Sequence, residues 1–393
     1  IQINSGISAD VILNPGSDIT GAINSDAVDM GNKITLLSNP DVEGATVLKA
    51  PITGSWDVTK DGEGTWTLAS TDNNFRGKLM IKGGEGDDPD DSILQLGDGR
   101  TDGNFGTKNI QAQNKTMIRL NNLSDTNLAD TTFAFEDTTV PIQLTNKGNV
   151  TFGDIDLSNT DFEVYGEGAI ILGDGRSQSN NLIHAKTLSY KGSPETASNG
   201  KSGFIFDFGP EAKDPDHPNS PANGYSAIIL SYEQSLGNLS FINSGYDDSG
   251  KATEYQFRTS GRPFSYGNTA KGVNLTVGKG TKVYSNLNEG DDVCGDYSCD
   301  SAFNFENIIV EEGGTLIRMD GSWSDPNRSS GFNDAYINNL LNDGSIIAKS
   351  LGGGAISSDN GWDVDNIWIN RGSIELKGGG IDMGEGNDIL LTN

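Results

Sequence analysis

The sequence lacks the features of a helical protein and of a membrane-spanning helix. Only 34% of its 393 residues are hydrophobic, which is below the usual globular share. No window repeats apolar residues at the three- and four-residue spacing of an amphipathic helix. No apolar run reaches the roughly 18 residues of a membrane-spanning helix. These absences argue against a thick α/β core and against a helical membrane anchor within the chain.

Basic residues and histidines are scarce. The chain carries 27 basic and 55 acidic residues, a net charge of −28, so nucleic acid and anionic membranes are poor partners. Of the two histidines, His184 lies among apolar residues and His217 lies in a proline-rich loop. We expect a structural role for the first and solvation for the second. No Gly-Asp-Ser-Gly motif is present, so we expect no Ser-His-Asp triad.

Cysteine is also scarce. Cys294 and Cys299 are the only two, in the stretch Asp292–Asp300. The flanks contain no second pair and no nearby histidine, so a zinc ion would lack ligands. We expect a small disulfide loop between these residues, in an oxidising compartment.

The sequence is instead rich in glycine, with 52 residues, and in short alternating apolar runs that end at Gly, Asn or Asp. Such runs are typical of short strands separated by tight turns. The predicted strands are 33–37, 65–68, 116–120, 142–144, 227–230, 273–277, 308–310 and 315–318.

Related strands recur along the chain with small changes. Leu94-Gln-Leu-Gly-Asp-Gly-Arg100 is echoed by Ile171-Leu-Gly-Asp-Gly-Arg176. One such strand does not bury its apolar side alone, but a stack of about 20-residue coils does. Regularly spaced Ile, Leu, Val and Phe argue against disorder. We therefore predict an all-β fold, a parallel β-helix with long loop excursions in the middle.

The regular pattern breaks at four loop excursions, near 192–225, 243–268, 288–301 and 322–334. Loops of this length usually carry function or are disordered. The first contains one possible strand, Gly203–Phe208. Next to the last, the stretch 335–341 fits either one or two helical turns or a strand.

Four segments together resemble the passenger-associated repeat of bacterial autotransporters. They are Gly64-Thr-Trp-Thr-Leu68, Asn73-Asn-Phe-Arg-Gly77, Ile81-Lys-Gly-Gly84 and Leu94-Gln-Leu-Gly97. An acidic insert, Glu85–Asp91, splits the last part of the repeat. The resemblance implies a right-handed β-helix exported through an outer-membrane barrel. On this basis residues 1–393 are expected to form a single β-helix passenger, a fragment that ends in mid-pattern and lacks the C-terminal barrel of its precursor.

The sequence gives no strong signal for catalysis. Among 55 acidic residues some carboxylate pair always lies close together, so a glycosidase pair is a weak signal. Gly384–Leu390 resembles part of a calcium-binding nonapeptide, but the unit before it fits poorly and a structural turn ladder is the better interpretation. We expect no enzyme activity, no cofactor and no metal.

Aromatic and charged residues in the excursions are the candidate ligand-binding groups, because aromatic faces stack on sugars and Arg forks hold carboxylates or sulfates. The alternative is that these side chains only pin long loops to the fold. The candidates are Lys213, Tyr225, Asp247, Asp248, Tyr255, Arg258, Arg262, Tyr297, Trp323, Arg328 and Asp334.

The resemblance and these loops lead to one expected function and two alternatives. We expect a secreted, cell-surface adhesin, anchored to the outer membrane in its precursor. Its partner would be a host extracellular-matrix protein, fibronectin-like, or a glycosaminoglycan or other glycan. One alternative is self-association that drives cell aggregation and biofilm formation. The other is a polysaccharide lyase or glycosidase built on a β-helix.

Overall fold

The structure is a computed structural model. It describes residues 2–3, 10–14, 23–25, 32–38, 45–83, 92–113, 115–135, 140–153, 160–173, 182–185, 187–197, 200–208, 225–230, 234–246, 252–259, 270–286, 303–319, 339–349, 356–357, 366–376, 381–383 and 386–393. The chain divides into two compact units, Ile1–Ile170 and Ile171–Asn393. Each is described by itself.

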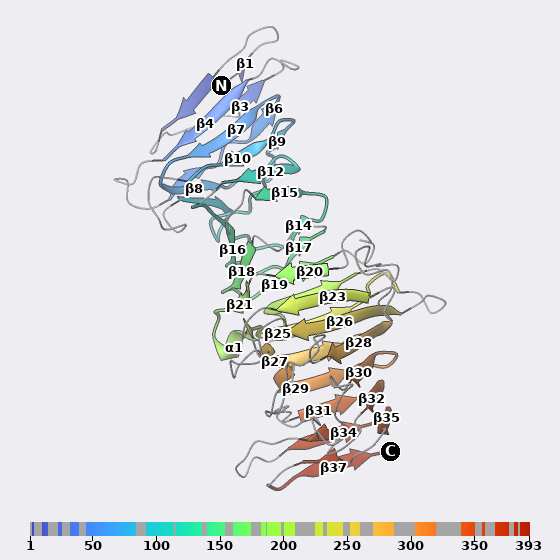
Figure 1. The fold of residues 1–393 in the computed structure, drawn as a ribbon. Helices are drawn as coiled ribbons and strands as arrows, with labels where there is room; N and C mark the ends of the chain where they lie inside the picture. Colours follow the sequence, from blue (N-terminus) through green and yellow to red (C-terminus); the bar gives the residue numbers. More distant parts are fainter. Residues whose placement is uncertain are drawn as a thin grey trace, which may run out of the picture. The chain divides into compact units, whose positions relative to one another are not determined.

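The first unit contains three parallel sheets (Figure 1). Sheet I consists, in spatial order, of β15 (Thr132–Phe135), β12 (Asn109–Ala112), β10 (Leu79–Ile81), β7 (Asp57–Asp61), β4 (Lys33–Leu37) and β2 (Asp10–Leu13). The strands of sheet II that belong to this unit are β18 (Thr160–Val164), β16 (Val140–Leu144), β13 (Met117–Leu120), β11 (Ser92–Leu96), β8 (Gly64–Leu68) and β5 (Thr46–Leu48). Sheet III consists of β1 (Gln2–Ile3), β3 (Ile23–Ser25), β6 (Ile52–Gly54) and β9 (Asn74–Phe75). In addition, β14 (Thr126–Leu128) pairs with β17 (Val150–Phe152).

The second unit is built from two larger parallel sheets. Sheet IV consists of β22 (Gly203–Asp207), β25 (Asn238–Ile242), β27 (Ala270–Val277), β29 (Phe303–Val310), β31 (Asn339–Asn342), β34 (Ile367–Asn370) and β37 (Ile389–Thr392). Sheet V consists of β20 (Leu182–Ala185), β23 (Tyr225–Leu230), β26 (Thr253–Thr259), β28 (Thr281–Asn286), β30 (Thr315–Met319), β32 (Ser345–Lys349) and β35 (Ser373–Leu376).

Short elements complete the description. They are β19 (Ala169–Leu172), which contains the boundary between the units, β21 (Thr187–Tyr190), α1 (Pro194–Ala197), β24 (Gln234–Ser235), which pairs with β27, and β33 (Ile356–Ser357), which pairs with β36 (Ile381–Asp382).

Columns of like side chains form the cores. In sheet II, in-register pairing stacks one buried apolar residue from each strand, in the column Leu48, Leu68, Leu96, Leu120, Leu144 and Val164. In sheet V the buried column is Tyr255, Val283, Leu316 and Ile346. A one-residue slip would move each column to the other face, so burial fixes the register.

The prediction of an all-β fold with stacked parallel strands is confirmed. The strand predicted at 33–37 is β4, and the possible strand at Gly203–Phe208 is β22. Within the ambiguous stretch 335–341, residues 339–341 belong to strand β31. The prediction of one β-helix over 1–393 stays a prediction.

The excursion limits need correction. Residues 253–259, inside the predicted excursion 243–268, form β26 in the middle of sheet V. Residues 203–207, inside the predicted excursion 192–225, form β22 of sheet IV. The strand at 203–207 was expected as a possible strand inside its excursion, whereas the alternation of β26 was obscured by its polar surroundings.

Candidate functional site

In the second unit, long segments follow the carboxyl-terminal ends of the sheet V strands. Because its strands are parallel and in register, their last residues lie in a row, as Asn286, Met319 and Lys349 do. Segments 260–269, 287–302 and 320–338 each connect such an end to the start of a sheet IV strand. Figure 1 shows these strands side by side. Successive long connections therefore begin side by side, at the carboxyl-terminal ends of the sheet V strands.

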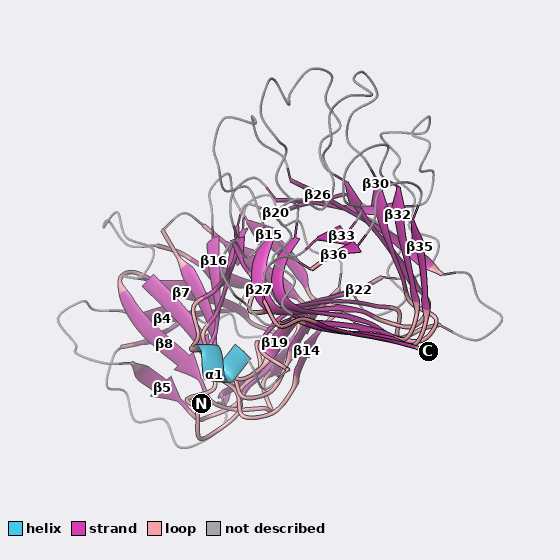
Figure 2. Ribbon diagram, turned by 90° about the horizontal axis from the view of Figure 1, so that it is seen from below, coloured by secondary structure: helices cyan, strands magenta, loops and turns pink. Residues whose placement is uncertain are grey.

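The return connections, from sheet IV to sheet V, are mostly tight. Only Gly278–Gly280, Glu311–Gly314, Asp343–Gly344 and Arg371–Gly372 separate consecutive strands there. In Figure 2 the two stacks of strands meet along this corner beside the C-terminus. Gly280 and Gly313 have φ values of +73° and +80°, which glycine adopts without steric cost. Two longer connections, 208–224 and 243–252, also run from sheet IV to sheet V.

This topology sorts the candidate ligand-binding residues into two groups. Arg262, Tyr297, Trp323, Arg328 and Asp334 fall in the connections from sheet V to sheet IV. Lys213, Asp247 and Asp248 fall in the connections that run the other way. All eight, and the predicted disulfide pair Cys294 and Cys299, lie outside the described residues. The candidates thus belong to two corners of the fold rather than to one.

Three candidates lie in strands of sheet V, namely Tyr225, Tyr255 and Arg258. Tyr225 begins β23, where it pairs with Glu254, and Arg258 lies near the end of β26, opposite Asn286. Arg258 is thus next to the edge from which the long connections leave. His184, predicted to be a structural strand residue, lies in β20.

Tyr255 is a core residue, so its predicted role in surface ligand binding is wrong. Its side chain is fully buried against Phe208 and Phe241. The phenol oxygen accepts the Phe208 N–H at 2.8 Å and donates to the Ile242 carbonyl at 2.7 Å. Burial raises the pKa of Tyr255 well above its usual value. The ring therefore stabilises the stack and faces no ligand.

A polar cluster in the first unit was missed by sequence reasoning. Lys60 lies in the inner column of sheet I between Leu36 and Ile81, and its side chain is fully buried. Its amine donates to the Ser92 hydroxyl at 2.6 Å and to the Gly62 carbonyl. Burial lowers the pKa of Lys60 to about 8, against the charges of Asp61 and Glu63.

This cluster closes the base of the acidic insert. The Ser92 hydroxyl lies 3.0 Å from the carbonyl oxygens of Gly62 and of Lys82. Lys82 and Ser92 flank the insert, so the cluster holds its two ends together. Ser92 and Lys60 are both fully buried and bond to each other and to backbone carbonyls, so we assign the pair a structural role.

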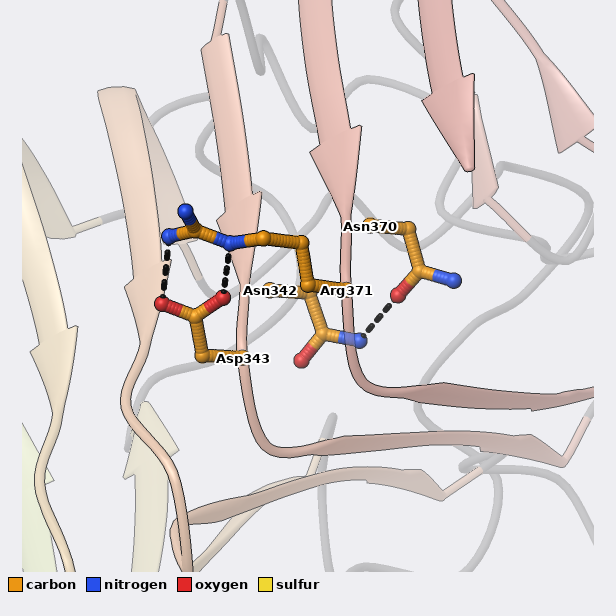
Figure 3. Close-up of polar contacts among 4 residues, drawn as sticks. All are labelled: Asn342, Asp343, Asn370 and Arg371. Atoms are coloured by element: carbon orange, nitrogen blue, oxygen red, sulfur yellow. Dashed lines mark hydrogen bonds and ion pairs between the residues drawn. The ribbon is translucent and has the colours of Figure 1, made fainter. Parts of the chain in front are cut away.

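Asparagine side chains form a hydrogen-bonded ladder across sheet IV. Asn274 donates to Asn238 at 2.7 Å, Asn307 to Asn274 at 2.8 Å, and Asn339 to Asn307 at 2.8 Å. A second pair, Asn342 to Asn370, is shown in Figure 3. The four asparagines of the first ladder lie within strands β25, β27, β29 and β31, so their side chains stack because the strands pair in register. The asparagine side chains bond to one another between adjacent strands, so we assign them a structural role.

Carboxylates fasten backbone turns in the first unit. Burial alone would raise the pKa of the Asp98 carboxyl, but the N–H groups of Arg100 and Thr101 outweigh that effect and hold the pKa below its usual value. Asp102 likewise accepts the N–H of Leu123, at 2.6 Å, from the next turn. These acids, like the asparagines, are engaged in structure.

The described residues show neither a metal cluster nor a spanning helix. No group of three or more His, Cys, Asp or Glu side chains gathers within the described ranges to hold a metal ion. In the same part of the chain, no helix has the length and apolarity to cross a membrane. The predictions of no metal, no cofactor and no enzyme activity stay predictions.

Comparison with known proteins leaves these features without a relative. No family model, curated protein or solved structure matches the chain.

Proposed function

We propose that the protein is a secreted, cell-surface adhesin of the autotransporter-passenger type. In this proposal the parallel stacks close into right-handed coils of a β-helix, and the long connections leaving sheet V bind the partner. The observation that carries the proposal is the single row of strand ends, Asn286, Met319 and Lys349, from which successive long segments depart. From β27 onward the return connections are short and are engaged in stacking.

The partner in this proposal is a host extracellular-matrix protein, fibronectin-like, or a glycosaminoglycan or other glycan. The segments rooted on the row contain Arg262, Tyr297, Trp323 and Arg328. Aromatic rings and Arg groups are the side chains most enriched in binding hot spots. A rigid scaffold that carries variable loops is the usual arrangement for recognition. The C-terminal barrel of the precursor would anchor the protein to the outer membrane.

The experiment compares replacements at the two corners. Segments 261–268, 288–301 and 321–337 are each replaced by a Gly-Ser linker, and 209–223 is replaced in the same way as a matched control. None of these replacements removes a described strand. Each variant is tested on an array of extracellular-matrix proteins and glycans, with circular dichroism as the folding check.

The proposal predicts that a ligand captured by the intact chain is lost in at least one of the first three variants and is kept by the control. Equal capture by all four variants would contradict it, as would loss in the control alone. An intact chain that captures nothing on the array and releases reducing or unsaturated ends from acidic polysaccharides would instead favour the enzyme alternative.

A further inference from the structure

The outer face of sheet IV carries an apolar row. Ile309 and Leu341 each stand between two buried neighbours on their strands, and Ile369 follows the buried Trp368. Because side chains alternate along a strand, these three point away from the core. In-register pairing continues the row to Leu391 on β37, which is 54% exposed. We call Ile309, Leu341, Ile369 and Leu391 the apolar row.

The row is a local feature of this face. The same column runs from Ile205 on β22 to Ser240 and Thr276 on β25 and β27, and the last two are the polar residues expected on a solvated face. From β29 to β37 every residue of the column is apolar. Beside it, Ile367 and Ile389 are 45% and 48% exposed. The apolar row is half-buried at its first three residues and exposed at the fourth. A contiguous apolar patch of this kind marks an interaction surface rather than scattered surface residues.

Charged residues border the row in the tight connections, each one position after the end of its strand. They are Glu311, Asp343 and Arg371. Two nitrogens of Arg371 donate hydrogen bonds to the two carboxylate oxygens of Asp343, at 2.6 and 2.7 Å (Figure 3). The Arg371 side chain is still 53% exposed and that of Asp343 is 32% exposed. An apolar centre with a polar rim is the usual anatomy of a protein interface.

We propose that the apolar row docks against the same row of a second copy of this chain. A two-fold axis parallel to the strands, placed between β31 and β34, reverses the order of strands in the second copy. Leu341 then faces Ile369 of the second copy, and Ile309 faces Leu391 of the second copy. The spacing matches at all four positions because both rows repeat at about 4.8 Å.

The charged rim favours a second copy over an unrelated apolar partner. Under the same rotation, Asp343 of each copy comes opposite Arg371 of the other. Opposite charges therefore meet on both sides of the axis, as an isologous interface requires. The four strands that carry the apolar row span about 14 Å, which is small for a stable interface. The dimer is accordingly weak and forms only at high protein concentration.

Sedimentation velocity on the whole chain between about 1 and about 200 µM, the range of weak association, tests the proposal. The wild-type chain should shift from monomer toward dimer as its concentration rises. Leu341→Lys places a charge at the centre of the row and should weaken the dimer by about tenfold or more. The matched control Thr276→Lys lies on the same column outside the row and should leave the dimer unchanged.

A mixing experiment tests whether the rim pairs between copies. Asp343→Arg alone and Arg371→Asp alone each set like charges opposite one another, so neither variant should dimerise by itself. An equimolar mixture restores opposite charges on both sides of the axis and should form a mixed dimer. A monomeric wild-type chain throughout the range would overturn the proposal. So would a dimer that survives Leu341→Lys, or a mixture that stays monomeric.

Discussion

At the scale of the residue, Lys60 departs most from the pattern of its surroundings. It occupies an inner position of sheet I, where its neighbours on adjacent strands are Leu36 and Ile81. A buried ammonium loses its hydration, and its hydrogen bonds to Ser92 and Gly62 return only part of that free energy. Relative to the unfolded chain, the folded state therefore shifts the equilibrium of Lys60 toward its neutral amine.

Lys60 should make the protein more stable at alkaline pH. The pKa falls from 10.5 in the unfolded chain to about 8 in the folded one, so between these values the unfolded state binds more protons. Stability thus rises from about pH 8 to about pH 10.5, by about 3 kcal/mol. Urea unfolding of the wild type and of Lys60→Met across this range should show the rise only in the wild type. Parallel pH profiles would contradict this account.

Gly103 should be intolerant of any side chain. A Cβ at this position would collide with the Leu68 carbonyl oxygen, and the backbone N–H and C=O of Gly103 are both bonded to the Asn122 amide. Gly103→Ala should cost about 2–4 kcal/mol of stability. Gly200→Ala is the matched control. Its φ is +79° but nothing lies near its Cβ, so it should cost about 1–2 kcal/mol. Chemical denaturation measures both, and equal losses would argue against close stacking at Gly103.

Single residues were the hardest part to predict from sequence. Tyr255 was assigned to a loop because its segment is polar, yet Glu254-Tyr-Gln-Phe-Arg258 alternates as a strand should. Attention to that alternation would have placed it in the core. Lys60 follows a similar alternation, but nothing in the sequence shows that a lysine takes the buried side. That outcome depends on Ser92, which lies 32 residues away along the chain.

At the scale of the element, the asparagine ladder should contribute measurably to sheet IV. Asn274 both donates to Asn238 and accepts from Asn307. Asn274→Ala leaves two partners unsatisfied in a half-buried site and should destabilise the protein by about 1–3 kcal/mol. Asn339→Ala, at the exposed end of the ladder, removes one bond and should cost less than about 1 kcal/mol. Equal effects in urea denaturation would show that the ladder carries no stacking energy.

Strands were predictable because their burial is regular. The run at 33–37 alternates clearly and is β4, and the run at 315–318, with its adjacent apolar residues, is part of β30. The parallel arrangement also followed, since one short strand does not bury its apolar side alone. The limits of the excursions did not follow. They depend on which strand of a neighbouring coil is available for pairing, and that information is not local.

At the scale of the whole molecule, topology separates two kinds of corner in the second unit. The tight corner stacks Gly344 against Gly372 and bears the Asp343–Arg371 ion pair. The other corner gives rise to the long segments. In our proposal, ligand binding belongs to the long connections and stacking to the tight ones. The proposed adhesin role depends on the second corner, and the proposed dimer depends on the outer face of sheet IV.

The in-register parallel stack is the claim on which both proposals rest, and pulsed electron spin resonance distances test it directly. Tyr225, Glu254, Lys282, Thr315, Ser345 and Ser373 form one column of sheet V. Spin labels at 254 and 373 should be separated by about 19 Å, and labels at 225 and 373 by about 24 Å, one strand spacing more. Both distributions should be narrow. Broad distributions, or a separation that does not grow by one strand spacing, would contradict the stack.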